Sequence, residues 1–313
     1  MHAVTIAGSR LEWTPKPEPV PGDTEVLVDV KAAGLNAADL LQRAGLYPAP
    51  PGVFPDVPGI ELAGVVAAVG ARVTTVSVGD RVMAVVPGAA QAELAVADAA
   101  CLIPVPSGMA WDEAGGFAEA FSTAHDALVT QCGLSVGDRV LVTGAAGGVG
   151  TAAVQLAAAA GASVVASVRA PELRDSVRAL GAAEALDPGA ALGRGPFDVA
   201  LELVGGASFP GVLASLGTGG RLAVIGIGAG ARAEIDLLAL MQRRGRIHGS
   251  TLRARSPAEK TAVAAAVRRH VLPLLEARRV HVPLAETFPM ANAAAAYERF
   301  TEGQKLGKIV LVR

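Results

Sequence analysis

The stretch Arg139–Gly150, RVLVTGAAGGVG, decides the fold of this chain. Its first residues, Arg139–Thr143, are an apolar run typical of a buried strand, and Val149–Ala160 has the composition of a helix. The glycines between them are spaced G-x-x-G-x-x-G, which permits a tight turn and lets backbone N–H groups approach a pyrophosphate. A turn without a ligand is the alternative, but the strand before it and the helix after it favour dinucleotide binding. The expected cofactor contacts there are Ala146, Gly147, Gly148 and Val149.

The rest of the second half repeats this pattern of apolar strands separated by helices. Further strands are expected at Ser163–Val168, Ala185–Leu186, Phe197–Leu203, Gly220–Gly226 and Arg246–Ser250, and helices at Pro171–Leu180 and Phe209–Leu216. Such alternation predicts a parallel sheet with helices on both faces. The sequence therefore predicts an α/β fold whose second half is a doubly wound Rossmann domain.

The first 115 residues or so differ, because they have the pattern of short strands and turns, with many prolines that break long helices. The main exception is Asn36–Arg43, expected to be a short helix with an Asn cap. The last strand, Lys308–Val312, is expected to return to this first domain. We predict a mainly β domain of residues 1–119 and 253–313, and a Rossmann domain of residues 120–252.

Composition narrows the function classes. With 313 residues, 51% of them hydrophobic and 18% charged, the chain supports a large core and about two domains. A net charge of −2 without a basic run argues against nucleic acid as a partner. No apolar run reaches the ~18 residues that span a bilayer, and the N-terminus lacks the pattern of a signal peptide. Cys101 and Cys132 have no metal-like spacing, which fits a reduced, cytoplasmic compartment.

The end of the second Rossmann strand indicates which nicotinamide cofactor is bound. An acid there would bind the ribose 2′-hydroxyl, but this chain has no acid until Glu172. Instead, Ser167, Arg169 and Arg174 offer hydrogen-bond donors and positive charge for a 2′-phosphate. NADPH is therefore favoured, and arginines that are merely solvated at a helix start are the alternative.

Several further segments resemble the medium-chain dehydrogenase/reductase superfamily and, within it, the quinone oxidoreductases. They are Asn36-x-x-Asp39, Gly45-Leu-Tyr47-Pro48, Gly59-Ile-Glu61-x-x-Gly64, Gly79-Asp80-Arg81-Val82 and Gly307-Lys308-Ile-Val. More narrowly, ADLLQRAGLYPAPPG, AVVPGAAQAE and GSTLRARS resemble the branch of the tumour-suppressor-inducible quinone oxidoreductase. The resemblance runs along nearly the whole chain. It implies a GroES-like substrate domain, a Rossmann domain, and NADPH in the cleft between them.

The resemblance also implies a zinc-independent enzyme. Alcohol dehydrogenases of the superfamily carry Cys at the position of Asn36 and His at the position of Ile60, and their four-cysteine zinc lobe has no counterpart here. Too few ligands then remain for a catalytic zinc. Hydride transfer to a quinone or an activated alkene instead needs an oriented acceptor. It also needs hydrogen-bond donors that stabilise the negative charge that develops on the acceptor's oxygen.

By resemblance, three residues are the expected catalytic set. Tyr47 is expected to donate a hydrogen bond to the acceptor or to orient it. The alternative is a structural role, in which its hydroxyl is bonded to the backbone. Asn36 and Asp39 lie three apart on one helix face, where they would meet the nicotinamide ribose or the acceptor. Asn36 can also be a helix cap. Glu61 follows a glycine and precedes apolar residues, so it is expected to be half-buried and paired with Arg81 as a structural anchor, with a catalytic role as the alternative.

The remaining expected cofactor contacts follow strand ends or lie on the helix between the domains. They are Thr123, Gly226, Ile227, Ser250, Thr251, Leu252 and Lys308. Helix packing is the alternative for Thr123, and a surface position is the alternative for Lys308. The histidines are not spaced like the ligands of a metal ion. We expect His125 to pack in the interior, and we expect His270 and His281 to be solvated.

One departure from the family pattern concerns the 2′-phosphate, because Leu173 stands where relatives often carry a lysine. The favoured function is an NADPH:quinone oxidoreductase. An enoyl reductase acting on an α,β-unsaturated ketone or thioester is one alternative, and a non-catalytic NADPH-binding protein of crystallin-like or regulatory type is another. The resemblance further implies a homodimer joined through the last Rossmann strand, around Ile247–Leu252.

Overall fold

The glycine-rich turn lies in a parallel sheet whose strand order is β10-β9-β8-β11-β12-β13 in the computed structural model, which describes residues 1–8 and 10–313. The strands are β8 (Arg139–Val142), β9 (Ser163–Ser167), β10 (Glu184–Leu186), β11 (Phe197–Glu202), β12 (Leu216–Val224) and β13 (Arg246–Gly249). Numbered within the sheet, this order is 3-2-1-4-5-6, the order of a Rossmann sheet. The predicted fold class is confirmed.

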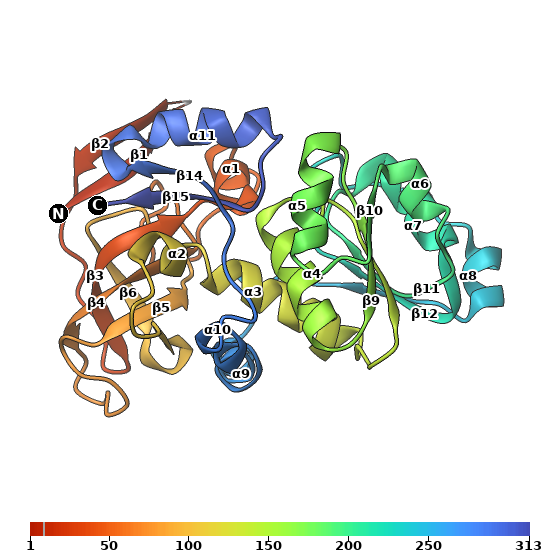
Figure 1. Cartoon of the computed structure of the whole chain (residues 1–313). Coiled ribbons are helices and arrows are strands. Elements are labelled where there is room, and N and C mark those ends of the chain that lie inside the picture. The colour runs from red at the N-terminus through yellow and green to blue at the C-terminus, as the bar shows by residue number, and fades with distance from the viewer. Residues whose placement is uncertain (9) are drawn as a thin grey trace.

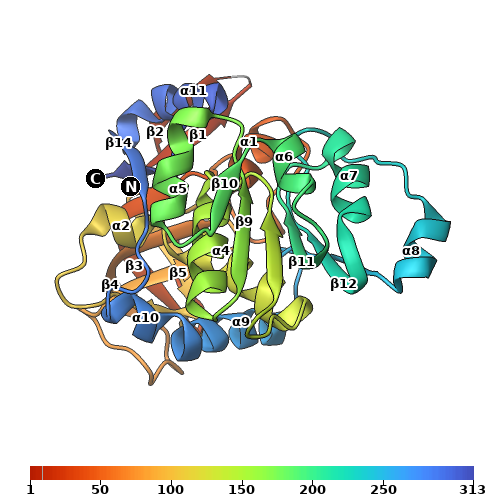
Figure 2. The same ribbon diagram turned by 45° about the vertical axis from the view of Figure 1, so that its right-hand side comes forward.

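Helices cover both faces of this sheet. They are α4 (Gly148–Ala159), α5 (Arg174–Ala179), α6 (Pro188–Leu192), α7 (Phe209–Ala214) and α8 (Leu237–Arg243). Figure 1 shows α4 and α5 between the sheet and the first domain, with α6 and α7 on the other side. Figure 2 shows α8 at the far end of the molecule, beyond β12.

The first domain is built on a second sheet, of order β14-β15-β3-β4-β5-β7, with β6 also paired to β3. Its strands are β3 (Glu25–Gly34), β4 (Glu61–Val69), β5 (Arg81–Val85), β6 (Leu94–Asp98), β7 (Ile103–Pro104), β14 (Leu284–Pro289) and β15 (Lys308–Val312), beside a hairpin of β1 (His2–Ala7) and β2 (Arg10–Pro15). The last strand, β15, pairs antiparallel with β3, which confirms that the chain returns to this domain. Both termini lie there (Figure 1).

A buried helix joins the two domains. It is α3 (Ala118–His125), which follows α2 (Trp111–Gly115), continues into the π-helical turn η2 (Asp126–Gln131), and packs against α4. The rings of Phe117 and Phe121 stack with centroids 4.6 Å apart, and both side chains are buried. Because residues four apart share a helix face, α3 presents Glu119 and Thr123 on one side.

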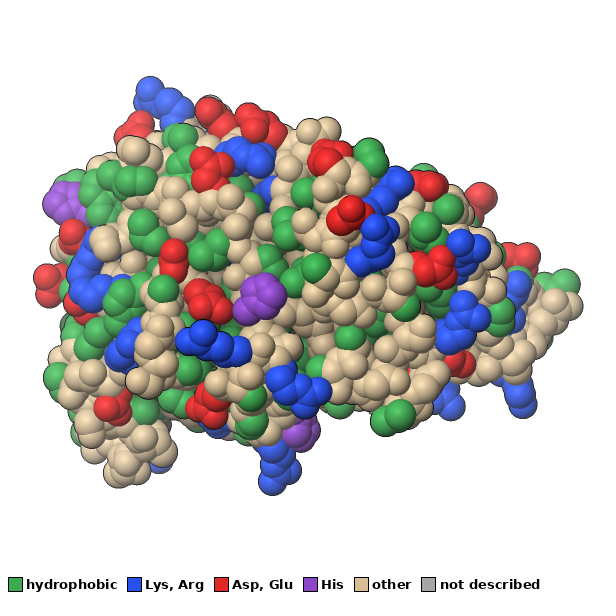
Figure 3. All heavy atoms as spheres, in the orientation of Figure 1, with side chains coloured by type: hydrophobic (Ala, Val, Ile, Leu, Met, Phe, Trp, Pro, Cys, Tyr) green, Lys and Arg blue, Asp and Glu red, His purple; other side chains and the backbone are tan. Residues whose placement is uncertain are grey.

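The remaining helices are α1 (Ala37–Arg43), α9 (Pro257–His270), α10 (Leu272–Glu276) and α11 (Ala293–Glu302). Helix α9 packs against α3 and the short turn η1 (Ala99–Cys101). No helix within the described ranges is long and apolar enough to cross a bilayer. Basic and acidic side chains are interspersed over the face drawn in Figure 3, in keeping with the small net charge.

Candidate active site

A cavity of about 1330 Å³ lies between the two domains, at the carboxyl ends of the parallel strands. Residues following β8, β11, β12 and β13 line one side, and α1 and the Tyr47 loop line the other. Doubly wound sheets bind their ligands in this crevice. The predicted site residues that line it are Asn36, Tyr47, Thr123, Gly147, Gly148, Val149, Gly226, Ile227, Ser250, Thr251, Leu252 and Lys308. Asp39, Ala146, Ser167 and Arg169 are not among its lining residues.

The glycine-rich loop is packed too tightly for larger residues. A Cβ atom on Gly150 would lie 2.4 Å from the carbonyl oxygen of Gly144. Gly147 is the N-cap of α4, and the first N–H groups of a helix have no acceptor within it. The loop is also tied to the first domain, since the Gly307 N–H donates to the Ala146 carbonyl at 2.8 Å. Free N–H groups and a helix N-terminus at a cavity wall fit the pyrophosphate of a dinucleotide.

The end of β9 carries the polar groups predicted to select the cofactor. Ser167 is buried at the strand end, and Arg169 two residues later is exposed. The Arg169 guanidinium has no hydrogen bond or ion pair with any residue that the structure describes, so it is available to a ligand. Arg174 is partly engaged, because its Nε donates to the Val168 carbonyl at 3.2 Å.

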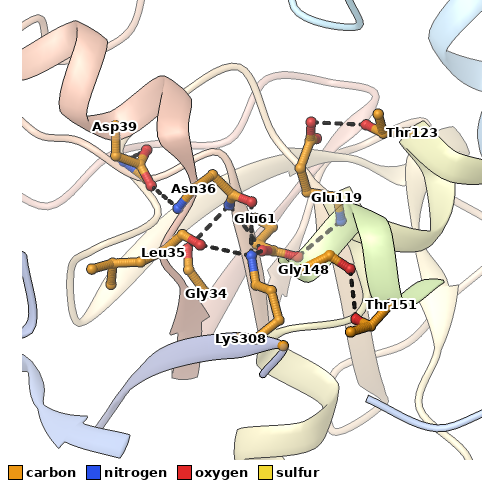
Figure 4. Close-up of polar contacts among 12 residues, drawn as sticks. Gly34, Leu35, Asn36, Asp39, Glu61, Glu119, Thr123, Gly148, Thr151 and Lys308 are labelled. Atoms are coloured by element: carbon orange, nitrogen blue, oxygen red, sulfur yellow. Dashed lines mark hydrogen bonds and ion pairs between the residues drawn. The ribbon is translucent and has the colours of Figure 1, made fainter. Parts of the chain in front are cut away.

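A buried ammonium group lies beneath the glycine loop. Lys308 Nζ donates to the Leu35 carbonyl and Asn36 Oδ1, both at 2.7 Å, and to Glu61 Oε1 at 2.6 Å (Figure 4). Asn36 Nδ2 also donates to Glu61 Oε1, at 2.9 Å. The three donors of the ammonium are thus used within the protein. The alternative of a surface lysine is wrong, because Lys308 is only 3% exposed.

Glu61 therefore pairs with Lys308 and not with Arg81, which corrects the predicted partner. The Arg81 guanidinium donates to the Met109 carbonyl at 2.6 Å and lies 4.2 Å from the centroid of the Trp111 ring. The expected ion pair failed because β15, which carries Lys308, reaches Glu61 from the far end of the chain.

Asp39 lies apart from the cavity, contrary to the expectation that it meets the ribose or the acceptor. Its side chain is fully buried and accepts hydrogen bonds from the Asn36 N–H at 2.8 Å and the Gly59 N–H at 3.1 Å. Burial raises the pKa of this carboxyl to about 7, against the opposing effects of those N–H groups and of Lys308. Asp39 shapes the start of α1 and the turn before β4.

Tyr47 is held by an arginine that the sequence analysis did not single out. The Arg253 guanidinium carbon lies 4.5 Å from the centroid of the Tyr47 ring, and Nη1 donates to the Tyr47 carbonyl at 3.0 Å. Nη2 donates to Gln42 Oε1, also at 3.0 Å. Within the described part of the chain the Tyr47 hydroxyl has no hydrogen-bond partner, unlike a tyrosine anchored to the backbone. Arg253 thus orders the ring of a residue that lines the cavity, and it does not engage the hydroxyl.

A second ion pair fixes the loop that carries Arg253. Arg255 donates to both carboxylate oxygens of Asp126, at 2.8 and 2.5 Å, and to Ser250 Oγ at 2.7 Å. Asp126 follows α3 directly and is 2% exposed. The loop after β13 is therefore fastened to the helix that joins the domains.

Glu119 is a cavity residue that the sequence analysis missed. Its Oε1 accepts from the Thr123 hydroxyl at 3.0 Å, one helical turn away on α3. Burial and the neighbouring Glu61 raise the pKa of this carboxyl to about 7. A carboxyl four residues before a predicted cofactor contact, on the same face of one helix, was the available signal.

Two histidines lie in contact beside α3. His125 is buried and His270 is exposed, both as expected, and His125 Nε2 lies 3.0 Å from Nδ1 of His270. Burial and the nearby His270 lower the pKa of His125 to about 4. Across residues 1–8 and 10–313, no group of three or more His, Cys, Asp and Glu is placed to hold a metal ion.

Comparison with known proteins identifies both domains. Residues 22–132 match the alcohol dehydrogenase GroES-like domain, and residues 148–268 match the zinc-binding dehydrogenase domain. The chain is 30% identical over 306 residues to the quinone oxidoreductase of Lama guanicoe, covering 94% of this chain and 90% of that protein. It is 39% identical over 207 residues to polyketide synthase GfsB of Streptomyces halstedii, covering 64% of this chain but only 4% of the synthase.

Solved structures agree with this assignment. The quinone oxidoreductase of Thermus thermophilus, which has also been solved in complex with NADPH, superposes with a TM-score of 0.86. It is 35% identical to this chain, and each chain is covered completely. This chain therefore belongs to the quinone oxidoreductase family of the medium-chain dehydrogenase/reductase superfamily.

Proposed function

We propose that this chain binds NADPH in the interdomain cavity and reduces a quinone by hydride transfer, without zinc. The observation that carries the proposal is that one cavity joins the glycine-rich loop to Tyr47 and Thr123. Bound NADPH would supply the hydride. The similarity to quinone oxidoreductases over nearly the full length supports both the cofactor and the acceptor class.

The chain's own residues would hold the cofactor along the carboxyl edge of the Rossmann sheet. The N–H groups of Gly148 and Val149 at the start of α4 would bind the pyrophosphate. Ser167 and Arg169 would bind the 2′-phosphate, with the exposed guanidinium supplying the charge. The predicted contacts Gly226 and Ser250 lie on the same edge, after β12 and β13.

The acceptor would lie on the side of the cavity formed by the first domain. The Tyr47 hydroxyl, ordered by Arg253, is the proposed donor to the acceptor carbonyl. The amide nitrogen of Asn36 already donates to Glu61, so Asn36 is proposed as a positioning residue that keeps the cavity wall in place. Neither role requires a metal, because a quinone is an easy hydride acceptor.

The test is steady-state NADPH oxidation with a panel of ortho- and para-quinones, enones and enoyl thioesters. The proposal expects turnover with quinones at the highest kcat/KM of the panel, and a loss of at least tenfold in Tyr47→Phe. Absence of turnover with every quinone in wild-type protein would overturn it.

An enoyl reductase is the second candidate, and the similarity to polyketide synthase GfsB favours it. The same cavity would then place the carbonyl of an α,β-unsaturated ketone or thioester beside Tyr47. Turnover confined to the enone and enoyl-thioester members of the panel would select this reading. NADPH binding without turnover of any acceptor would select a non-catalytic role.

We infer in addition that the protein is a cytoplasmic homodimer. Strand β13 is at the edge of its sheet, and α8 beside it exposes Leu237, Leu238 and Met241 by 63 to 72%. An open strand edge next to apolar side chains is a surface that a second copy covers. The buried, unpaired Cys101 and Cys132 fit a reducing compartment. Light scattering that shows a monomer at micromolar concentration would contradict the dimer.

A further inference from the structure

The Glu119 carboxyl is only half satisfied by the protein. Its Oε1 accepts from the Thr123 hydroxyl at 3.0 Å, whereas its Oε2 is buried and has no hydrogen-bond partner among the described residues. A buried polar atom without a partner costs about 1–3 kcal/mol, more if it is charged, and points to a missing proton or ligand. Glu119 lines the cavity between the domains, so the missing partner can be an acceptor bound there.

The charges around Glu119 do not provide it with a counterion. Figure 4 shows its carboxyl turned toward Thr123 and away from the Lys308–Glu61 pair. Lys308 is the nearby buried cation, and its ammonium is bound to Glu61 Oε1 at 2.6 Å. Glu61 Oε2 in turn accepts from the Glu119 backbone N–H at 2.8 Å, so the negative charge of Glu61 lies beside the residue and raises the pKa of its carboxyl.

The other ionisable neighbours act on Glu119 in opposite directions. Asp39, from α1, adds further negative charge, while Arg253, which also lines the cavity, is engaged with Tyr47 and Gln42. Among the described residues, the charges that act most strongly on Glu119 are the carboxyl groups of Glu61 and Asp39 and the ammonium of Lys308, which is paired with Glu61, so the low-cost arrangement keeps Glu119 protonated. A protonated carboxyl becomes a hydrogen-bond donor.

We propose that Glu119 is the proton donor to the acceptor oxygen, a role that rests on the proposed quinone reduction. In this role the carboxylic acid carries its proton on the unpartnered oxygen, which is buried in the wall of the cavity that Glu119 lines, and the other oxygen accepts from Thr123. Thr123 thereby fixes the orientation of the acid. Tyr47, on the loop after α1, orients the acceptor against it.

The proposed step balances with the groups named. A quinone that receives one hydride has gained two electrons and one proton, and becomes the hydroquinone monoanion. The Glu119 O–H bond then breaks, and its proton forms the second O–H bond of the hydroquinone. Glu119 is left as a carboxylate and recovers its proton from water when the product departs. General acid catalysis of this kind contributes typically ~10²–10⁴-fold, and most when the pKa is near the working pH.

The first test uses infrared difference spectroscopy on the protein without cofactor. When wild-type protein is titrated, two carbonyl-stretch bands of protonated carboxyl groups should disappear near neutral pH. One band should be absent from Glu119→Gln, and the other should be absent from Asp39→Asn. At pH 6, adding a quinone should shift the Glu119 band and leave the Asp39 band unchanged. The proposal is overturned if Glu119 is already ionised at pH 6, or if the Glu119 band does not shift when the quinone is added.

The second test compares the pH dependence of kcat in wild type and in Glu119→Gln, an isosteric variant that cannot titrate. Wild-type kcat should fall above about pH 7 in proportion to the protonated fraction, while the variant should be slower by about 100-fold at pH 6 and independent of pH. If wild type reduces quinones and the variant keeps the same profile, Glu119 is not the donor. If wild type reduces no quinone, the proposed function fails, whatever the infrared result for Glu119.

Discussion

The Glu61 carboxylate accepts from the Lys308 ammonium at 2.6 Å, with side-chain exposures of 0 and 4%, and so links β4 to the C-terminal strand beneath the glycine-rich loop. Removing one partner leaves a buried charge, which costs about 3–5 kcal/mol. Lys308→Met should lower the free energy of unfolding by that amount in urea titration. Lys308→Met combined with Glu61→Gln should recover part of the loss. A single variant as stable as wild type would show that the pair is not a structural link.

Gly150 tests the fit of the phosphate loop. In Gly150→Ala the new Cβ would lie 2.4 Å from the Gly144 carbonyl oxygen and 2.7 Å from the Ala145 Cα, so the loop has to open. NADPH affinity, measured by calorimetry, should fall at least tenfold. Gly249→Ala is the matched control, since a Cβ there meets nothing within 4 Å, and it should bind like wild type. Unchanged affinity in Gly150→Ala would place the pyrophosphate elsewhere.

Arg169 tests the choice of cofactor. Its exposed and unengaged guanidinium is proposed to bind the 2′-phosphate, so Arg169→Ala should weaken NADPH about tenfold or more and leave NADH unchanged. Arg178→Ala, on α5 and paired with Asp175, is the control and should affect neither cofactor. Equal affinities of wild type for NADPH and NADH would refute the preference.

His125 predicts a pH dependence of stability. Its pKa in the folded protein is lowered to about 4 by burial and by His270, below the ordinary value of 6.5. Between these values the unfolded chain binds the proton more readily, so this group destabilises the fold as the pH falls from 6.5 toward 4. The urea midpoint of unfolding should therefore fall less steeply with decreasing pH in His125→Asn than in wild type, when both are measured from pH 4.5 to 7.5. The difference between variant and wild type is the informative quantity, because Asp39 and Glu119, with raised pKa values, act in the opposite sense.

The Rossmann half was predictable because its pattern is local. Apolar strands and alanine-rich helices alternate along the chain, and predicted strands such as Arg139–Thr143 and Ser163–Val168 lie within a residue of β8 and β9. The final strand, Lys308–Val312, was placed at its observed bounds. The hairpin β1–β2 and strand β14 were not predicted. Strand β2, RLEWTP, alternates polar and apolar residues and so carried a signal, whereas β1 and β14 are short and do not alternate strictly.

The site was less predictable, because its polar contacts join distant parts of the chain. Lys308 meets Glu61 across 247 positions, and Arg253 meets Tyr47 across 206. Proximity in sequence instead favoured Arg81 as the partner of Glu61, and helix periodicity placed Asp39 beside Asn36 without showing that it turns into the protein. Glu119 was missed in part for a similar reason, since, besides Thr123 on its own helix, its neighbours Glu61 and Lys308 come from β4 and β15.

The central claim is that hydride passes from NADPH to a quinone inside the interdomain cavity, and a single-turnover experiment tests it most directly. The protein is loaded with one equivalent of NADPH and mixed rapidly with a quinone, and the absorbance of the reduced nicotinamide is followed beside hydroquinone formation. The account predicts that both signals change at one rate and in a one-to-one ratio, and that Tyr47→Phe slows them together. Bound NADPH that stays reduced in the presence of every quinone would contradict it.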